Sequence, residues 1–460
     1  MSKIRVAGGQ GFYGDTPSAV DALLAEGVDY LCLEALAELT LAILQKDRQK
    51  DETRGFTRDL PAYLARALPF VVDGRTKVIT NAGGINPTAA AHAAVETARA
   101  LGISGIKIAT VVGDDVLGRL DDLHTQHGQA FTHNDTGAAF SELPGPALFA
   151  SAYLGARPIA DALAQGADIV ITGRVADASL FLAPLAYEHA WAWDDWDRLA
   201  AGILVGHLLE CSGQSLGGNY SGDWWALPHP WDLPYPIATV DADGTAVISK
   251  PAGAGGRVST DTLRHQLLYE VHDPRRYLSP DVVADFTSAH FEDLPDDRVR
   301  ITDVKGTPAT DTYKLLLATH AGWASEARVA FSWPDAYEKA KATAAILVKR
   351  VEMAGHDVDE WLVEYWGVDA LGGPTAHAGA DPACEPPECV LRVAWRCADQ
   401  RTAALVGREL VPLTLSAPPA GMTGAGGRGG GPTELLSIWP TLIDKKLVDA
   451  EVRVVLEEVS

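Results

Sequence analysis

The stretch KVITNAGGINPTAAAHAAVETARALG, residues 77–102, decides the fold because it places a strand, a glycine turn and a helix in immediate succession. Residues 77–80 are rich in β-branched side chains, and small apolar residues recur at helical spacing from 87 to 102. Pro87 suits a first helical turn, and Asn86 before it predicts a side-chain cap. The stretch therefore predicts one strand–helix unit of a parallel sheet.

The same alternation recurs over residues 1–220. Strand-like runs are IRVAG, DYLCLEA, IKIATVVG and ADIVITGR, and helical runs between them include SAVDALLAEG and RPIADALAQG. We therefore predict an α/β domain over residues 1–220, with a mainly parallel sheet flanked by helices. Rossmann-like and partial-barrel closures both fit this pattern.

Residues 219–236, NYSGDWWALPHPWDLPYP, are dense in proline and tryptophan and predict a boundary without regular structure. Beyond the boundary, a hairpin over 236–250 and an amphipathic helix over 336–355 predict an α+β unit spanning 237–460. Interleaving of this unit with the first is left open. The glycine-rich stretch 418–432 lacks the Lys-Ser/Thr of a phosphate loop, which leaves a linker and an anion-contacting loop as alternatives.

Composition argues against several classes of partner. The chain has 460 residues and a formal net charge of -23, from 61 acidic and 38 basic residues. A negative surface repels phosphate and anionic lipid, so we expect neither nucleic acid nor membrane as a partner. The start MSKIRVAGGQ has no signal-peptide pattern, so the cytoplasm is the expected compartment. Five cysteines without a CxxC pair predict reduced thiols.

Ligands of parallel sheets collect where the strands end. The segments that follow the predicted strands are GGQGFYGD, LEALAE, TNAGGINP, VGDD and TGRVADAS. The first segment lacks G-x-G-x-x-G, so no nicotinamide or flavin cofactor is expected. Asp15, before Thr16-Pro17, predicts a helix cap. No spacing of His, Cys, Asp and Glu predicts a tightly bound metal.

Two of these segments carry candidate substrate-binding residues. In TNAGGINP, the backbone amides of Gly83 and Gly84 and the Asn81 side chain are suited to holding a carboxylate or thioester oxygen. A simple turn capped by Asn86 is the alternative. In ITGRVADAS, Arg174 is suited to gripping a carboxylate or phosphate, and Asp177 is either a general base or the ion-pair partner of that arginine.

A second group of candidates follows in HLLECSGQSLGGN. Residues 195–214 predict a helix with four polar side chains on one face: His207, Glu210, Cys211 and Gln214. His207 with Glu210 predicts a general base and its orienting group, and Cys211 predicts a nucleophile. Gln214 and Asn219 are further substrate-binding candidates.

A buried, hydrogen-bonded cluster is the alternative to a catalytic role for this polar face. If the face is catalytic, the predicted helix crosses the carboxyl edge of the sheet. Its four polar side chains then line the same cavity as Gly83, Gly84 and Arg174.

Seven motifs occur in order: GFYGD, LEALAELTLAILQ, TNAGGINP, GDD, GADIVITGRVADASL, HLLECSGQ with its GGN, and LLYEVHDPRRYLSPDVVADF. Through them the chain resembles the acyclic terpene utilisation family of AtuA-like proteins, from about residue 5 to about residue 455. The resemblance implies a place in bacterial breakdown of citronellol and geraniol, among enzymes acting on branched acyl-CoA thioesters. Many family members carry a further C-terminal ferredoxin-like domain, so a separate small ferredoxin-like protein is an expected partner.

Together these residues predict an enzyme that acts on a carboxylic acid or acyl-CoA thioester. We expect a lyase or hydratase that uses acid–base chemistry without a redox cofactor. A thioester or ester hydrolase working through Cys211 is the alternative among enzymes, and a non-catalytic acyl-CoA-binding accessory subunit is the alternative outside them. A chain of this size and class is also expected to form a homo-oligomer.

Overall fold

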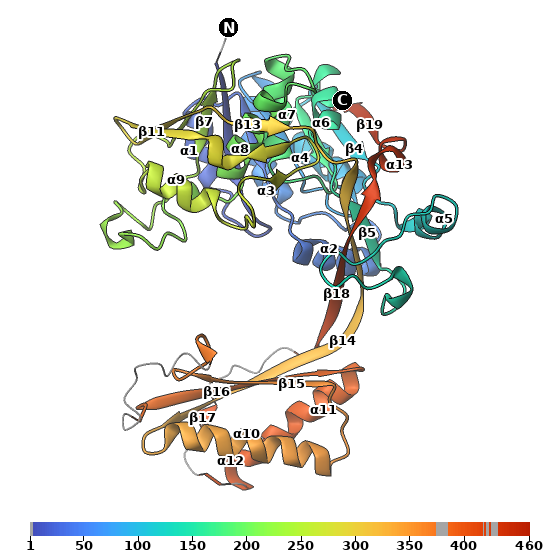
Figure 1. The fold of residues 1–460 in the computed structure, drawn as a ribbon, viewed down its shortest axis with the longest axis vertical. Helices are drawn as coiled ribbons and strands as arrows, with labels where there is room; N and C mark the ends of the chain where they lie inside the picture. Colours follow the sequence, from blue (N-terminus) through green and yellow to red (C-terminus); the bar gives the residue numbers. More distant parts are fainter. Residues whose placement is uncertain (1–2, 374–384, 417, 420–422, 425–430) are drawn as a thin grey trace. The chain divides into compact units, whose positions relative to one another are not determined.

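A computed structural model describes residues 3–373, 385–416, 418–419, 423–424 and 431–460 (Figure 1). The chain packs into two compact units. Unit 1 comprises residues 1–143, 147–318 and 438–460, and unit 2 comprises 144–146 and 319–437. This division differs from the predicted boundary at 219–236, because strands on both sides of that loop belong to the same sheet of unit 1.

Unit 1 is built on a ten-stranded sheet with the order β11-β12-β8-β7-β1-β2-β3-β6-β4-β19. Its strands are β1 (Ile4–Gln10), β2 (Tyr30–Leu33), β3 (Lys77–Thr80), β4 (Lys107–Val112), β6 (Ile169–Thr172), β7 (Ile237–Val240), β8 (Ala246–Ser249), β11 (His290–Leu294), β12 (Arg298–Thr302) and β19 (Arg453–Glu458). The predicted hairpin over 236–250 is confirmed as the antiparallel pair β7 and β8.

The prediction of a mainly parallel sheet is wrong, because the sheet is mixed. Pairings among β1, β2, β3, β6 and β4 are parallel, whereas every other pairing in this sheet is antiparallel. The antiparallel strands come from residues 237–302 and 453–458, far along the chain from the strands they join. The α/β class holds for the parallel centre, and β11 and β19 leave the sheet open at both edges.

Helices cover both faces of the parallel centre because alternate strand residues are apolar on both sides. Leu31, Val78 and Ile169 face one helical layer, formed by α1 (Ala19–Ala25), α3 (Leu60–Val72) and α4 (Pro87–Ala100). Cys32 and Val170 face the opposite layer, formed by α6 (Arg157–Ala164), α7 (Ser179–Glu188) and α8 (Trp196–Leu209).

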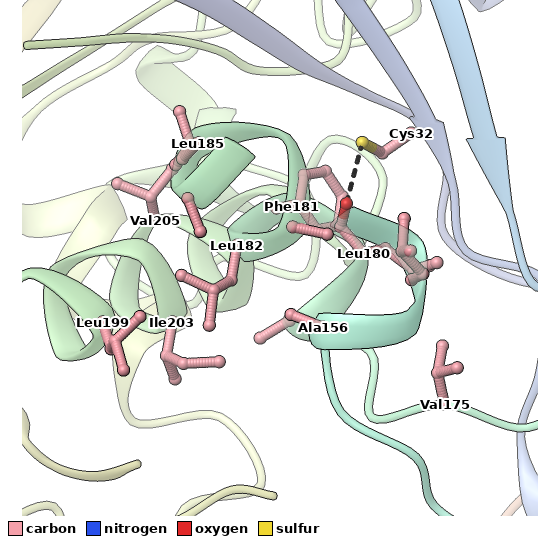
Figure 2. Close-up of a cluster of buried hydrophobic side chains, with 14 of the residues drawn as sticks. Cys32, Ala156, Val175, Leu180, Phe181, Leu182, Leu185, Leu199, Ile203 and Val205 are labelled. Carbon is pink, nitrogen blue, oxygen red and sulfur yellow. Dashed lines mark hydrogen bonds between the residues drawn. The ribbon is translucent and has the colours of Figure 1, made fainter. Parts of the chain in front are cut away.

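Figure 2 shows part of this second layer, where apolar side chains of α7 and α8 gather in one cluster and the Cys32 thiol donates to the Leu180 carbonyl, with 3.4 Å between the atoms. Each fully buried leucine or isoleucine contributes about 1.5–3 kcal/mol relative to exposure. The layer therefore fixes α7 and α8 firmly against the sheet.

Further elements of unit 1 surround this sandwich: α2 (Glu38–Lys50), α5 (Leu120–Thr125), β5 (Phe149–Ala152), α9 (Thr260–Leu267), β9 (Tyr277–Leu278), β10 (Val283–Asp285), β13 (Lys305–Thr307) and α13 (Lys445–Asp449). Strands β13, β10 and β9 form a small separate sheet. The long strand β14 (Thr312–Ser332) pairs with β5 through residues 315–318. β18 (Thr433–Asp444) pairs with β14.

Unit 2 contains a sheet in the order β15 (Glu360–Trp366), β16 (Glu388–Cys397), β14 and β17 (Thr423–Gly424). Its helices are α10 (Ala336–Met353), α11 (Gln400–Leu410) and α12 (Leu413–Ser416). The predicted helix over 336–355 is confirmed by α10. Most of the glycine-rich stretch 418–432 lies outside the described residues, so its two alternatives stay predictions.

Candidate active site at the carboxyl ends of the parallel strands

A cavity of about 450 Å³ opens where the parallel strands of unit 1 end. The connection after β3 leads to α4 on one face, whereas the connection after the neighbouring β6 leads to α7 on the other face. Diverging connections of this kind leave a crevice at the strand ends, where ligands of open α/β sheets bind. The cavity is lined by Gly11, Phe12, Glu34, Leu36, Ala37, Glu38, Tyr153, Arg174, Asp177, Glu210, Cys211, Ser212, Gln214, Tyr269, Glu270 and Lys314.

Arg174 follows β6 and is the central cation of the cavity. Its side chain is only 3% exposed, and Nη1 lies 3.0 Å from Asp177 Oδ1 and 3.8 Å from Glu34 Oε1. Nη1 also donates to the Leu36 carbonyl at 2.8 Å, and the guanidinium carbon lies 4.1 Å above the Tyr153 ring. Burial disfavours the charge, but Asp177, Tyr153 and Glu34 together raise the pKa of Arg174. Contacts within the protein therefore fix the Arg174 side chain. The ion pair between Arg174 and Asp177 matches the second of the two roles predicted for Asp177, that of ion-pair partner.

Glu34, directly after β2, is a buried carboxyl group of the cavity wall. Its Oε1 accepts from the Leu36 amide at 2.7 Å and from Asn81 Nδ2 at 2.8 Å. Burial, followed by repulsion from Asp177, raises the pKa of Glu34 well above its ordinary value, and Arg174 offsets only part of this. Because Oε1 already accepts two hydrogen bonds, Oε2 is the atom left to carry a proton.

Two aspartates beside Arg174 also hold their protons more tightly than usual. Burial raises the pKa of Asp177 to about 7, with Arg174 opposing and Glu210 adding to the rise. Burial likewise raises the pKa of Asp114, which follows β4, to about 7. Asp114 Oδ2 accepts from the Arg174 backbone amide at 2.8 Å. Of the two, only Asp177 lines the cavity, and its side chain is 35% exposed.

A second ion pair lies beside the first. Glu38, the first residue of α2, accepts at Oε1 from Lys314 Nζ at 2.9 Å and from the Tyr153 hydroxyl at 2.8 Å. Although burial opposes ionisation, Lys314 lowers the pKa of Glu38 to about 2. Lys314 Nζ also lies 4.7 Å from the centre of the Tyr153 ring. The cavity therefore holds two cations next to one aromatic ring, with the pKa of Glu38 lowered and the pKa values of Glu34 and Asp177 raised.

His207 lies behind the cavity wall, in the last turn of α8, and is not among the lining residues. Its Nδ1 is 2.9 Å from Glu210 Oε1, and its ring stacks on Phe286 with 5.6 Å between centroids. Burial disfavours the imidazolium, but the hydrogen bond and charge of Glu210 outweigh burial and raise the pKa of His207. The positions differ from the prediction, because Glu210 faces the cavity and His207 supports it from behind.

Helix α8 is shorter than predicted. It begins at Trp196, capped by Asp195, and ends at Leu209 rather than 214. Ser212 has a φ of 50°, which no helix interior accommodates. Cys211 therefore lies in the turn after the helix, and Gln214 begins a short 3-10 helix, Gln214–Leu216. Both still line the cavity. Asn219 is exposed and donates to Gln214 Oε1 at 3.2 Å, without lining the cavity itself.

Cys211 has surroundings that suppress a thiolate. Burial and the neighbouring Glu210 carboxylate raise the pKa of the Cys211 thiol, and a hydrogen bond involving Gln266 offsets this only in part. The described cysteines, Cys32, Cys211, Cys389 and Cys397, are all free. Cys384 lies outside the described residues.

Gly8 within β1 and Gly11 just after it let the end of α8 approach the sheet closely. A side chain at Gly8 would collide with the Leu209 carbonyl, and one at Gly11 would collide with Ser212. Asp15 joins the same contact, since its Oδ2 accepts from Ser212 Oγ at 2.5 Å and from the Gly11 amide at 3.1 Å. The predicted cap role of Asp15 is wrong, because α1 begins four residues later, after Ser18.

Gly83 and Gly84 are absent from the cavity wall, so the predicted shared cavity is wrong for this pair. A side chain at Gly83 would meet the Thr172 carbonyl, and one at Gly84 would meet Leu44. These glycines therefore serve close packing. The alternative turn is confirmed, since Asn86 caps α4 by accepting from the Ala89 amide. Asn81 is buried behind Glu34 and acts on the cavity through that carboxyl group.

Sequence reasoning passed over several lining residues. Glu34 and Glu38 lie in LEALAE, a segment that was singled out only as a whole. Tyr153 and Lys314 carry no signal in the sequence. Tyr153 follows β5 and Lys314 lies in β14, and the antiparallel pairing of these strands joins distant parts of the chain. Within the described residues, no group of three or more His, Cys, Asp and Glu side chains is arranged to hold a metal ion. No described helix is long and apolar enough to cross a membrane.

Comparison with known proteins places the chain in a family. The model of the family described as acyclic terpene utilisation family protein AtuA matches residues 4–454. The chain belongs to this family. The match confirms the resemblance carried by the seven motifs, and it includes every residue that lines the cavity. No curated protein and no solved structure matches the chain.

Proposed function

We propose that this AtuA-family chain is an enzyme that applies acid–base chemistry to a carboxylic acid or acyl-CoA thioester, in a lyase or hydratase reaction. One observation carries the proposal: Asp177 and Glu34 both lie within 4 Å of the same Arg174 nitrogen, and both carboxyl groups have raised pKa values. Carboxyl groups whose surroundings separate their pKa values are suited to act as base and acid in one site.

Asp177 is the proposed general base. Its pKa of about 7 makes it available as a carboxylate at neutral pH while leaving it basic enough to accept a proton from carbon next to a carbonyl. Arg174 and Lys314 supply positive charge next to the negative charge that develops on the carbonyl oxygen. Glu210, which is hydrogen-bonded to His207, is a further carboxyl group that lines the cavity.

Glu34 is the proposed general acid. In a dehydration, Asp177 takes the Cα proton, the electron pair forms the Cα=Cβ bond, and the Cβ hydroxyl leaves as water with the Glu34 proton. In the hydration direction each transfer reverses. The volume of about 450 Å³ lies within the range of about 300–1,000 Å³ typical of small-molecule sites. The family description, utilisation of acyclic terpenes, favours a branched apolar chain on the substrate.

The cysteine-dependent hydrolase is the weaker alternative. A nucleophilic cysteine needs a lowered thiol pKa and a neighbouring cation or base, whereas the pKa of Cys211 is raised and its neighbour is the Glu210 carboxylate. The accessory-subunit alternative predicts binding without proton transfer, so the experiment below separates it from the proposal.

The proposal is tested by proton exchange, which needs no knowledge of the full reaction. The purified chain is incubated in D₂O with branched acyl-CoA esters and their free acids, and deuterium at Cα is measured by mass spectrometry. Asp177→Asn should lower the exchange rate by about 10²–10⁴-fold. Glu34→Gln should keep the exchange but abolish water elimination from 3-hydroxyacyl substrates.

The matched control is Asp223→Asn, because Asp223 also pairs with an arginine, Arg257, but does not line the cavity. This variant should exchange at the wild-type rate. Absence of exchange with every acid and ester would favour the accessory subunit, and full exchange by Asp177→Asn would assign the base to another residue.

A further inference from the structure

Within the part of the chain that the structure describes, β19 pairs only with β4 and forms one edge of the large sheet in unit 1. Its sequence, RVVLEE, contains no proline, and Val455 and Leu456 are 56% and 37% exposed. The other edge strand, β11, buries Phe291, and its Glu292 pairs with Arg300 of the neighbouring strand. Natural sheets usually blunt an edge with charge, proline or a covering element. The exposed apolar centre of β19 is therefore suited to pairing with a further strand.

The backbone of β19 has a defined outward side. The Val459 amide donates to the Ile106 carbonyl, toward β4. In an antiparallel strand, alternate residues direct their backbone N–H and C=O groups to the same neighbouring strand. The backbone groups of Val455 and Glu457 therefore also point toward β4. The backbone groups of Val454 and Leu456 then point away from the sheet, ready to pair with another strand.

We infer that β19 pairs antiparallel with β19 of a second copy of this chain, about a two-fold axis at Val455. Opposite residues of an antiparallel pair share one face of the sheet, so this axis places Val455 opposite the partner's Val455. On the same face, Arg453 lies opposite the partner's Glu457, and the symmetry makes this ion pair twice. On the other face, Val454 lies opposite the partner's Leu456, through the outward-facing backbone groups.

Charge complementarity selects this register. Among the described residues, Arg453 donates only to the carbonyls of Ala450 and Val452, and Glu457 forms no ion pair. Moving the axis by one residue to Leu456 places Val455 opposite the partner's Glu457 and leaves Arg453 without a carboxylate. Only the axis at Val455 joins apolar residues at the centre and opposite charges at both ends.

Charge reversal tests the interface. Analytical ultracentrifugation of the full chain should show a dimer, and Arg453→Glu or Glu457→Arg alone should weaken dimerisation by at least about tenfold, through like-charge pairs. The double variant, Arg453→Glu with Glu457→Arg, should restore the dimer. Arg300→Glu, which disturbs an ion pair at the opposite edge of the sheet, is the matched control and should remain dimeric.

A cysteine at the axis tests the register. Opposite residues of a non-hydrogen-bonded antiparallel pair have Cα atoms about 4.5 Å apart, within the range for a disulfide. Val455→Cys should therefore link two chains when copper phenanthroline oxidises the two thiols, with loss of two electrons and two protons. Glu457→Cys should not, because it faces the partner's Arg453, and the wild-type chain controls for native cysteines. A monomeric wild-type chain would overturn the inference, and so would a dimer that neither single charge reversal weakens and that Val455→Cys does not cross-link.

Discussion

Arg174 in unit 1 and Arg392 in unit 2 each lie between two carboxyl groups, but with different access to water. Arg174 Nη1 lies 3.0 Å from Asp177 and 3.8 Å from Glu34, in a pocket where the arginine is almost fully buried. Arg392 donates to Glu326 Oε2 at 2.7 Å and to Glu364 Oε2 at 2.8 Å, on a partly exposed sheet face. Both arginines contact two carboxyl groups, but Arg174 is buried whereas Arg392 is partly exposed to water.

The carboxyl groups respond in opposite directions. Hydrogen bonds from Arg392 and Trp366 lower the pKa of Glu364, whereas burial raises the pKa of Glu34 despite its arginine. An arginine neighbour therefore does not decide whether a carboxyl group holds a proton at neutral pH. Burial decides it, because removing water penalises the charged form more than one shared cation compensates. This difference supports acid–base chemistry at Arg174 and a structural role at Arg392.

The largest expected effect is a difference in the free energy of unfolding when each of the two arginines is replaced. Arg174→Met should lower the free energy of unfolding by about 3–5 kcal/mol, because it leaves buried carboxyl groups without their cation. Arg392→Met, the matched control, should lower it by about 0–1 kcal/mol, as for exposed ion pairs. Urea unfolding followed by circular dichroism measures both. Equal losses would contradict the role assigned to burial.

The next effect is a pH dependence of opposite sign in the two units. The raised pKa of Asp114, about 7, gives stability that is present below the unfolded value and lost as pH rises through about 7. Asp114→Asn should remove this decline, worth up to about 4 kcal/mol at about 1.4 kcal/mol per pKa unit. Glu364 has a lowered pKa, so its contribution is present above its unfolded value and lost as pH falls through the folded one.

The measurement is the unfolding free energy of wild type, Asp114→Asn and Glu364→Gln between pH 3 and 8. The wild-type chain should have a larger unfolding free energy than Glu364→Gln at neutral pH, and this difference should shrink toward low pH. Relative to Asp114→Asn, the unfolding free energy of the wild-type chain should fall as the pH rises toward 8. If the unfolding free energies of the two variants changed with pH in the same way, the opposite effects assigned to Asp114 and Glu364 would be wrong.

A smaller effect is expected at His207, whose pKa is raised chiefly by its bond to Glu210 against the effect of burial. Glu210→Gln should lower the His207 pKa in an NMR titration. In wild type, the His207 contribution to stability is present below the unfolded pKa and lost as pH rises through the folded one, so the variant should lose stability mainly on the acid side. Glu270→Gln removes another cavity carboxylate and is the matched control, with an unchanged His207 titration.

Much of the site was predictable because it follows local rules. Arg174 and Asp177 lie in the segment after a predicted strand, and strand ends of a parallel centre necessarily meet. Glu34 lies in a segment that the same rule indicates only as a whole. Lys314 and Tyr153 were not predictable, because they arrive through the pairing of β5 with β14, which joins residues more than 150 apart in the chain. The antiparallel strands of the large sheet were missed for the same reason, since alternation shows that a strand exists without showing its neighbour.

Glycine was the least informative residue type. Gly83 and Gly84 matched an anion-binding turn, but the same pattern arises when a backbone must pass close to a neighbouring strand, as it does at Thr172. The end of α8 was misplaced because the left-handed conformation of Ser212 follows from its bond to Asp15, about 200 residues away in sequence. Such tertiary contacts override local helix preference.

The smallest effect is expected at Cys211, which shares the cavity with Arg174 but neighbours the Glu210 carboxylate rather than the cation. Because the pKa of its thiol is raised, little thiolate is present at neutral pH, and alkylation by iodoacetamide should be slow in the native chain. Cys211→Ala removes no ion pair and should change the deuterium-exchange rate by less than about twofold, the range of substitutions that disturb no special contact. Glu210→Gln should speed alkylation of Cys211, since it removes the charge that disfavours the thiolate. Rapid alkylation of the wild-type chain at pH 7, coupled to loss of turnover, would instead place the chemistry on the thiol and favour the hydrolase over the lyase or hydratase.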